Sequence, residues 1–155
     1  MSELVSRSRI ACTIGEIASQ SRKSEASITV ISHDHAGPDT DFAIRMAETL
    51  GYWAVVVNLD PINALIRDPS KLRDDLAEKA SYGKNPLLFV IDATRYDAND
   101  PVCVKALDVI ATQMRGEWSI SGQASLYVIA GNPVRVAQRI GETLGRTDWT
   151  GFIRY

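Results

Sequence analysis

Four short apolar segments, each followed by a turn and then by a helical pattern, constrain the fold of this chain more than any other feature of its sequence. The segments are rich in β-branched residues, have the length of strands, and span residues 27–32, 53–59, 86–91 and 125–130. Apolar residues recur between them at the spacing of an amphipathic helix. Because alternating strands and helices with short connections form a parallel sheet covered on both faces, the pattern predicts a doubly wound α/β domain.

Cap residues and glycines set the expected limits of the helices. Each predicted helix begins at a polar cap residue or a proline, and three of them end at a glycine. The expected caps are Asp39 or Thr40, Ser70, Asp100 before Pro101 and Asn132 before Pro133, and the expected ends are Gly51, Gly116 and Gly145.

The number and order of the strands complete the predicted fold class. Residues 149–155 predict a fifth strand at an edge, and residues 53–59, apolar on both faces, predict a central or nearly central strand. The flavodoxin-like order 2-1-3-4-5 is the most economical choice for such a chain. We therefore expect one three-layer α/β domain with a five-stranded, mostly parallel sheet and an additional N-terminal helix.

Two regions are expected along the chain. Residues 27–155 form the α/β domain, and residues 1–26 form a helical segment whose apolar stripe is Ile10, Ile14 and Ile17. The stripe predicts docking on the flank of the sheet, and docking on a partner molecule is the alternative.

Composition limits the classes of function. A chain of 155 residues with 45% hydrophobic and 23% charged residues is long enough for one domain with a buried core. Its net charge of −2 provides no basic field, so we expect no nucleic-acid partner. Neither a membrane-spanning run nor the apolar core of a signal peptide is found, which predicts a cytoplasmic protein without membrane contact. Cys12 and Cys103 are far apart in apolar helical contexts and are expected to be reduced core thiols.

Polar residues at the end of the first strand and after the first and third strands are the candidate ligand-binding residues. They are Ser32, His33, Asp34, Asp92 and Tyr96. In parallel sheets, ligands bind at the carboxyl ends of the strands, so Asp34 and Asp92 could hold Mg²⁺ or share a proton. That arrangement would suit a Mg-dependent phosphoryl-transfer or hydrolytic enzyme. The alternative is that both carboxylates only satisfy turn amides.

The turn after the first strand gives little support for phosphate or metal binding. Residues 32–41 have the strand-turn-helix pattern of a P-loop but contain one glycine, no lysine and three aspartates. We expect no working phosphate-binding loop there, and a decayed one remains open. His33 and His35 flank Asp34, but a single tight turn rarely aims three such groups at one ion. We therefore expect no metal and no cofactor, and a nucleotide-like small molecule is the one small ligand considered.

Four stretches resemble Toll/interleukin-receptor (TIR) domains over roughly residues 28–107. TVISHDH at 29–35 and DFAIRMAETLGY at 41–52 are similar to the opening of these domains, and FVIDATRY at 89–96 and DPVCVKAL at 100–107 are similar to a later segment. The resemblance places Ala106 where the family has its catalytic glutamate and Val102 where it has a tryptophan. Without that carboxylate, the resemblance implies a domain that binds rather than cleaves.

The loop after the second strand mediates association in TIR domains. Its counterparts here are Asp60, Pro61, Ile62, Leu65 and Ile66. The resemblance thus implies a non-catalytic interaction or signalling domain that binds a protein partner or self-associates as a homodimer. The alternative for this loop is a short helix packed on the core.

Overall fold

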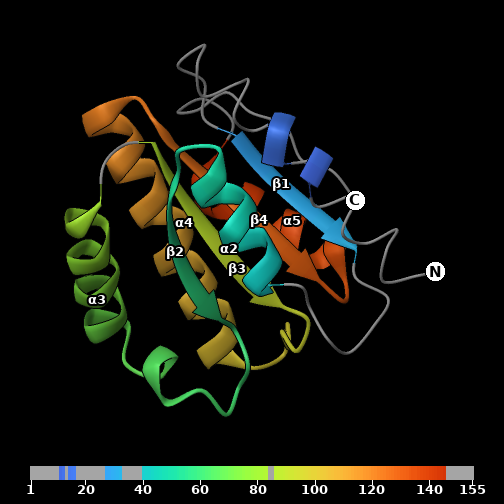
Figure 1. The fold of residues 1–155 in the computed structure, drawn as a ribbon. Helices are drawn as coiled ribbons and strands as arrows, with labels where there is room; N and C mark the ends of the chain where they lie inside the picture. The colour runs from blue at the N-terminus through green and yellow to red at the C-terminus, as the bar shows by residue number, and fades with distance from the viewer. Residues whose placement is uncertain (1–10, 13, 17–26, 33–39, 84–85, 146–155) are drawn as a thin grey trace.

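The computed structural model describes residues 11–12, 14–16, 27–32, 40–83 and 86–145, and the structural statements below concern these residues (Figure 1). The strands are β1 (Ser27–Ser32), β2 (Trp53–Asn58), β3 (Leu87–Ala93) and β4 (Ala124–Ala130). The helices are α2 (Thr40–Thr49), the 3-10 helix η1 (Ala64–Ile66), α3 (Pro69–Tyr82), α4 (Pro101–Ser121) and α5 (Pro133–Leu144). The predicted strand at 149–155 lies outside the described residues.

The four described strands form one parallel sheet in the order β1-β4-β3-β2. The predicted five-stranded flavodoxin-like order is therefore wrong, because β4, and not β2, lies beside β1. The prediction of a central second strand is wrong for the same reason, since β2 lies at an edge of this sheet. Its apolar residues misled the prediction because helices cover both faces of the sheet even at that edge. The coarser prediction of an α/β fold with a parallel sheet is confirmed.

Helices cover the two faces of the sheet unequally. The face with Leu88, Val90 and Tyr127 packs against α2, while α3, α4 and α5 cover the other face (Figure 1). Residues 11–12 and 14–16 are helical, and Ile14 is completely buried in the cluster that α2 forms with the sheet. This contact favours docking of the N-terminal segment on its own domain. Ile10 and Ile17 lie outside the described residues.

Two predicted helix limits are wrong. Asp68, and not Ser70, caps α3, because its Oδ1 accepts hydrogen bonds from the amides of Ser70 at 3.0 Å and Lys71 at 3.3 Å. Helix α4 continues past Gly116 to Ser121. Gly122 ends it with a left-handed φ of 73°, and its N–H donates to the Trp118 carbonyl. None of the described helices is long and apolar enough to cross a membrane.

A polar cluster fastens α5 to α4. The carboxylate of Asp108 on α4 accepts hydrogen bonds from Arg139 Nε at 2.8 Å, from Arg139 Nη2 at 2.5 Å and from Thr143 Oγ1 at 2.7 Å. Such a two-pronged guanidinium–carboxylate pair fixes geometry as well as contributing energy. The two helices that cover β4 and β1 are therefore held in one orientation.

Candidate functional site

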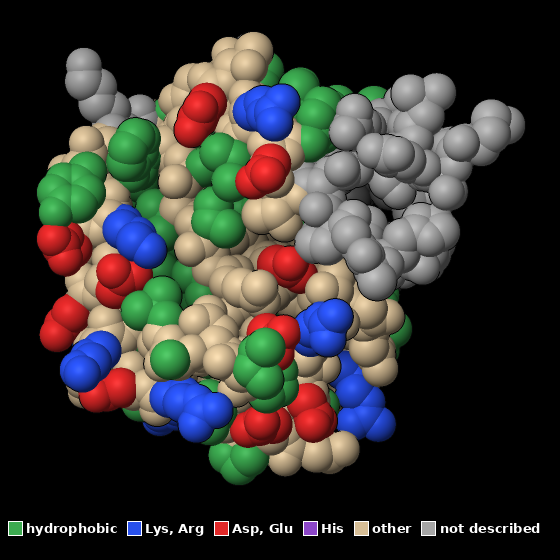
Figure 2. Space-filling view, turned by 60° about the horizontal axis from the view of Figure 1, so that its bottom comes forward, with side chains coloured by type: hydrophobic (Ala, Val, Ile, Leu, Met, Phe, Trp, Pro, Cys, Tyr) green, Lys and Arg blue, Asp and Glu red, His purple; other side chains and the backbone are tan. Residues whose placement is uncertain are grey.

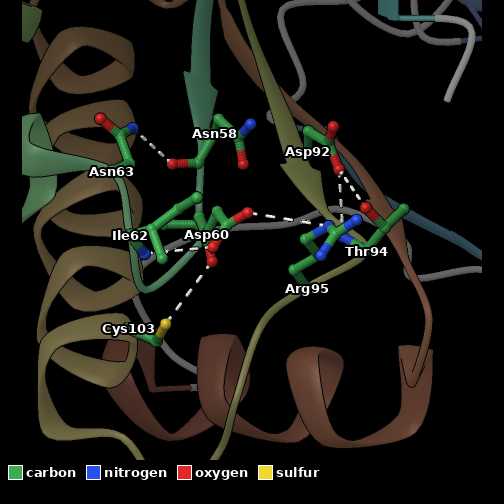
Figure 3. A network of polar contacts seen from close by, with 9 residues as sticks. Asn58, Asp60, Ile62, Asn63, Asp92, Thr94, Arg95 and Cys103 are labelled. Carbon is green, nitrogen blue, oxygen red and sulfur yellow. Dashed lines mark hydrogen bonds and ion pairs between the residues drawn. The ribbon is translucent and has the colours of Figure 1, made fainter. Parts of the chain in front are cut away.

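The strand register brings three described loops together at the carboxyl-terminal end of the sheet. Asn58 at the end of β2 pairs with Asp92, and Ala93 at the end of β3 pairs with Ala130 at the end of β4. The loops that follow these strands therefore start at the same level (Figure 3). In Figure 2, this end of the molecule comes forward and shows apolar side chains interspersed with acidic and basic ones, without a patch of one charge.

The loop after β2 has its shape fixed by side-chain-to-backbone hydrogen bonds. Asp60 Oδ1 accepts from the Ile62 amide at 3.1 Å, and Asn63 Nδ2 donates to the Asn58 carbonyl at 2.8 Å. Asn63 Oδ1 in turn accepts from the Leu65 amide at 3.1 Å and so caps η1 (Figure 3). Aspartate and asparagine thus replace the regular backbone pairing that a loop lacks, and they hold one conformation.

The predicted interaction residues divide into an exposed pair and a buried anchor. Ile62 is 81% exposed and Leu65 is 38% exposed, whereas Ile66 is 1% exposed and belongs to the core. The packing alternative therefore holds for Ile66, and the association role of the loop stays a prediction. The loop contains a short helix packed on the core through Ile66, and it presents Ile62 at its tip.

A charged pair beside Ile62 connects the loops after β2 and β3. Arg95 Nε lies 3.7 Å from Asp60 Oδ2, and the Arg95 side chain is 74% exposed while that of Asp60 is 14% exposed (Figure 3). A long ion pair whose cation is mostly exposed contributes little stability. It nevertheless places a positive group next to the apolar tip. Sequence reasoning missed Arg95, because nothing local indicates which residue of another loop faces Asp60.

The Asp92 carboxylate is hydrogen-bonded within its own turn. Its Oδ1 accepts hydrogen bonds from the Thr94 amide at 3.1 Å and from Thr94 Oγ1 at 2.7 Å (Figure 3). This is the alternative role that the sequence left open for the carboxylate. The described residues contain no cluster of three or more potential metal-ligating side chains. His33 and Asp34 lie outside the described residues, and for Ser32 only the backbone is described, so the Asp34–Asp92 magnesium site stays a prediction.

Tyr96 follows that turn, its amide donating to the Ala93 carbonyl at 3.2 Å, and it lines a cavity of 260 Å³ beside the start of α5. The cavity is lined by Tyr96, Asp97, Ala98, Asn99, Asn132 and Arg135. Burial raises the pKa of the Tyr96 hydroxyl, and nearby Asp108 raises it further while Arg139 opposes the shift. Asn132 and Arg135 were not predicted to line a site. The Asn132-Pro133 helix start was the available signal, since it places both residues at the carboxyl end of β4.

The position that corresponds to the TIR catalytic glutamate does not face solvent. Ala106 belongs to α4 and is completely buried in the core, next to Leu107. A carboxylate would be desolvated at this position. The neighbouring thiol of Cys103 is also buried, as expected, and burial raises its pKa. The expectation for Cys12 is wrong, because its side chain is exposed.

Comparisons with known proteins give no family for this chain. No family model matches it, and no curated protein matches it. Among solved structures, Rif2 of Saccharomyces cerevisiae is similar with a TM-score of 0.49 and 12% identity over 96% of this chain and 62% of that chain. A structure of Drosophila ORC bound to AT-rich DNA and Cdc6 is similar with a TM-score of 0.42 and 14% identity over 96% of this chain and 60% of that chain.

The chain spans about three fifths of the length of both structures. Likeness at this level carries no argument for what the present chain binds or does. The exclusion of a nucleic-acid partner is withdrawn, because it rested on net charge alone and one similar structure is a complex with DNA, which assigns no partner to this chain. A net charge of −2 does not decide how charge is distributed locally. The TIR resemblance is tested by none of these comparisons and stays a prediction.

Proposed function

We propose that this chain is a non-catalytic protein-interaction domain whose contact surface is the loop after β2, with Ile62 and Leu65 at its centre. The observation that supports this function best is the 81% exposure of Ile62 on a loop held by side-chain hydrogen bonds. A preorganised loop loses little conformational freedom when a partner covers it. Because Ile62 is exposed in the free domain, its burial stabilises a complex with a partner rather than the fold itself.

The expected contribution of this surface is large enough to measure. Burying an isoleucine side chain stabilises a complex by about 1.5–3 kcal/mol. Arg95 and Asp60 lie at the rim of the apolar tip, where charges contribute more to partner choice than to affinity. The loop therefore has an apolar centre with charged groups beside it, as interfaces commonly do.

The TIR resemblance supports the same function, since the loop after the second strand is the association loop in that family. Self-association as a homodimer is the simplest form of the proposal. A cytoplasmic location belongs to it as well, and the free Cys12 and Cys103 support that location. A signalling role is the finer version that the resemblance implies.

A pair of matched variants tests the loop. Ile62→Asp places a charge at the tip, and Ile120→Asp places one at the end of α4, where the isoleucine is 83% exposed. We expect sedimentation equilibrium to show concentration-dependent association of the wild type that Ile62→Asp weakens about tenfold or more. Ile120→Asp should leave it unchanged. Equal effects of the two variants, or a wild type that is monomeric at every concentration, would contradict self-association through this loop.

A second candidate function is binding of a nucleotide without turnover, and one observation favours it. Thr40 begins α2 directly after the first turn, and its Oγ1 is buried without a hydrogen-bond partner among the described residues. In P-loop proteins a Ser or Thr at this position and an aspartate that follows another strand hold Mg²⁺. Asp92 lies near the end of β3, the second strand from β1 in the sheet.

The residues before Thr40 are compatible with nucleotide binding but not with nucleotide hydrolysis. Where the motif G-x-x-x-x-G-K-[ST] has its second glycine and its lysine, this chain has Pro38 and Asp39. A carboxylate in place of the lysine repels the phosphates that the motif holds. We therefore infer a decayed P-loop without hydrolysis, and the Mg-dependent enzyme predicted from Asp34 and Asp92 is the competing hypothesis.

Thermal denaturation with Mg²⁺ and ATP tests this second candidate. A ligand at one hundred times its Kd stabilises the folded state by about 2.7 kcal/mol, so a bound nucleotide should raise the Tm of the wild type. Thr40→Ala should abolish the rise, while Thr112→Ala on α4 should retain it. An unchanged Tm in the wild type argues against nucleotide binding, and release of phosphate would instead favour the enzyme.

A further inference from the structure

A groove lies between α3 and α4, and Pro69 at the start of α3 places one end of it next to the loop after β2. It encloses 230 Å³, and its lining includes Pro69 and Arg73 from α3 and Lys105, Asp108, Val109 and Thr112 from α4. This volume accommodates one or two side chains of a partner rather than a whole helix. A partner would thus lie along the surface and insert single side chains.

The groove carries two exposed cations, and the charge of one of them, Lys105, also acts on the Asp108 carboxylate. Arg73 and Lys105 are exposed, and neither forms an ion pair with any residue that the structure describes. The carboxylate that lines the groove, Asp108, is already bound by Arg139 and Thr143. The local charge is therefore positive, although the net charge of the chain is −2.

The groove is amphipathic. Pro69 and Val109 contribute apolar surface, and Val109 packs against the core. A side chain that rests on them would lie between the two cations. The complementary ligand has an apolar side chain flanked by carboxylates, because opposite charges steer association and fix its register.

The groove also continues the proposed contact loop. Pro69 follows this loop after only Arg67 and Asp68, and η1, which contains Leu65, packs against both α3 and α4. A polypeptide that covers Ile62 and Leu65 can therefore extend along α3 into the groove. This continuity favours a polypeptide over a small ligand.

We propose that the α3–α4 groove binds an acidic amphipathic segment of the protein partner, with carboxylates against Arg73 and Lys105 and an apolar side chain on Pro69 and Val109. This inference rests on the proposed interaction function and identifies the chemistry of the partner. The segment binds by charge complementarity at the rims and by apolar burial at the floor.

The direct test uses a fluorescent peptide of fourteen residues with Glu and Leu at helical spacing, and a second peptide with Lys in place of every Glu. The anisotropy of the acidic peptide should rise with the full chain, and binding should weaken with salt. Arg73→Gln combined with Lys105→Gln should weaken it about tenfold. The control, Arg45→Gln combined with Lys71→Gln, removes the same charge from exposed positions outside the groove and should bind as the wild type does.

Several outcomes would overturn the inference. One is equal binding of the lysine peptide, and another is equal weakening by the control pair. A third is displacement of the acidic peptide by inorganic phosphate at constant ionic strength, which would indicate a small-anion site. Circular dichroism melting of each variant separates loss of binding from loss of folding. If Ile62→Asp weakens self-association while the groove pair leaves peptide binding unaffected, the groove inference fails and the interaction function stands.

Discussion

Removal of the Asp108 carboxylate tests whether the contact between α4 and α5 depends on this polar cluster. The carboxylate accepts two hydrogen bonds from Arg139 and one from Thr143, and the Asp108 side chain is only 20% exposed. Asp108→Ala removes all three bonds without altering the apolar contacts of the neighbouring turns. The variant therefore isolates the polar part of the helix packing.

The expected loss of stability is moderate. Breaking a fully buried ion pair costs about 3–5 kcal/mol because a charge stays behind without a partner. Here Arg139 is 37% exposed and lies 3.5 Å from Glu142, and Thr143 can still donate to the Arg139 carbonyl at 3.0 Å. No donor is left buried and unpaired, so we expect Asp108→Ala to destabilise the domain by about 1–2 kcal/mol. In a domain of this size that lowers the Tm by about 2–8 °C.

Urea denaturation of a double-mutant cycle measures this contribution. Asp108→Ala, Arg139→Ala and the double variant should give a coupling energy of about 1 kcal/mol. Asp75→Ala is the control, because Asp75 is similarly shielded, with 26% exposure, but pairs with Lys79 of its own helix at 2.9 Å. The control should cost less than about 0.5 kcal/mol. A coupling energy near zero, or a control that costs as much as Asp108→Ala, would refute the reasoning.

The stabilisation of the fold by the Asp108 carboxylate should decrease as pH falls. Burial alone would raise the pKa of Asp108, but the hydrogen bonds from Arg139 and Thr143 and the charges of Arg139 and Lys105 outweigh it and lower the pKa. A group whose pKa is lower in the folded state stabilises the fold fully above its unfolded pKa of about 3.9. That stability is lost as pH falls through the folded pKa. The difference between wild type and Asp108→Ala should thus shrink below about pH 4.

Two further predictions concern packing and thiol access. A Cβ on Gly83 would lie 1.9 Å from Trp53 Cγ, so Gly83→Ala should displace the ring, break its 2.7 Å hydrogen bond to the Lys79 carbonyl and destabilise the fold by about 1–3 kcal/mol in urea. Gly116→Ala, which meets nothing within 4 Å inside α4, should instead stabilise by about 0.5–1 kcal/mol, and the reverse ranking would contradict the described contact. Cys12 is exposed and Cys103 buried, so a thiol reagent should modify one cysteine in the native protein and both in urea, as mass spectrometry would show.

Parts of the site that depend on neighbours in sequence could be predicted. Asp100 caps α4 and Asn132 caps α5, as expected from the proline that follows each residue. The sequence placed Ile62, Leu65 and Ile66 together in one interaction loop, and the structure exposes the first two and buries Ile66. The difference has a simple cause, since adjacent residues of a short helix point in different directions and sequence does not say which of them faces the core.

Contacts between loops could not be predicted. Arg95 was not associated with Asp60, and the groove around Arg73 and Lys105 had no signal, because each depends on how distant segments pack. The C-terminal end of α4 could not be predicted for the same reason. Gly116 has the residue type of a helix end, but the helix continues because Trp118 in its last turn packs against the core.

The sequence by itself determined the strands, most helix starts and the α/β class, because hydrophobic periodicity and caps act over a few residues. Only the tertiary structure decided that β4 lies between β1 and β3 and that β2 is at an edge. The physical reason is that every buried strand of a sheet covered on both faces is apolar throughout, so the strands of this chain are chemically alike. Their order depends on how each helix packs across the sheet, and this order brings Asp60 and Arg95 together beside Ile62.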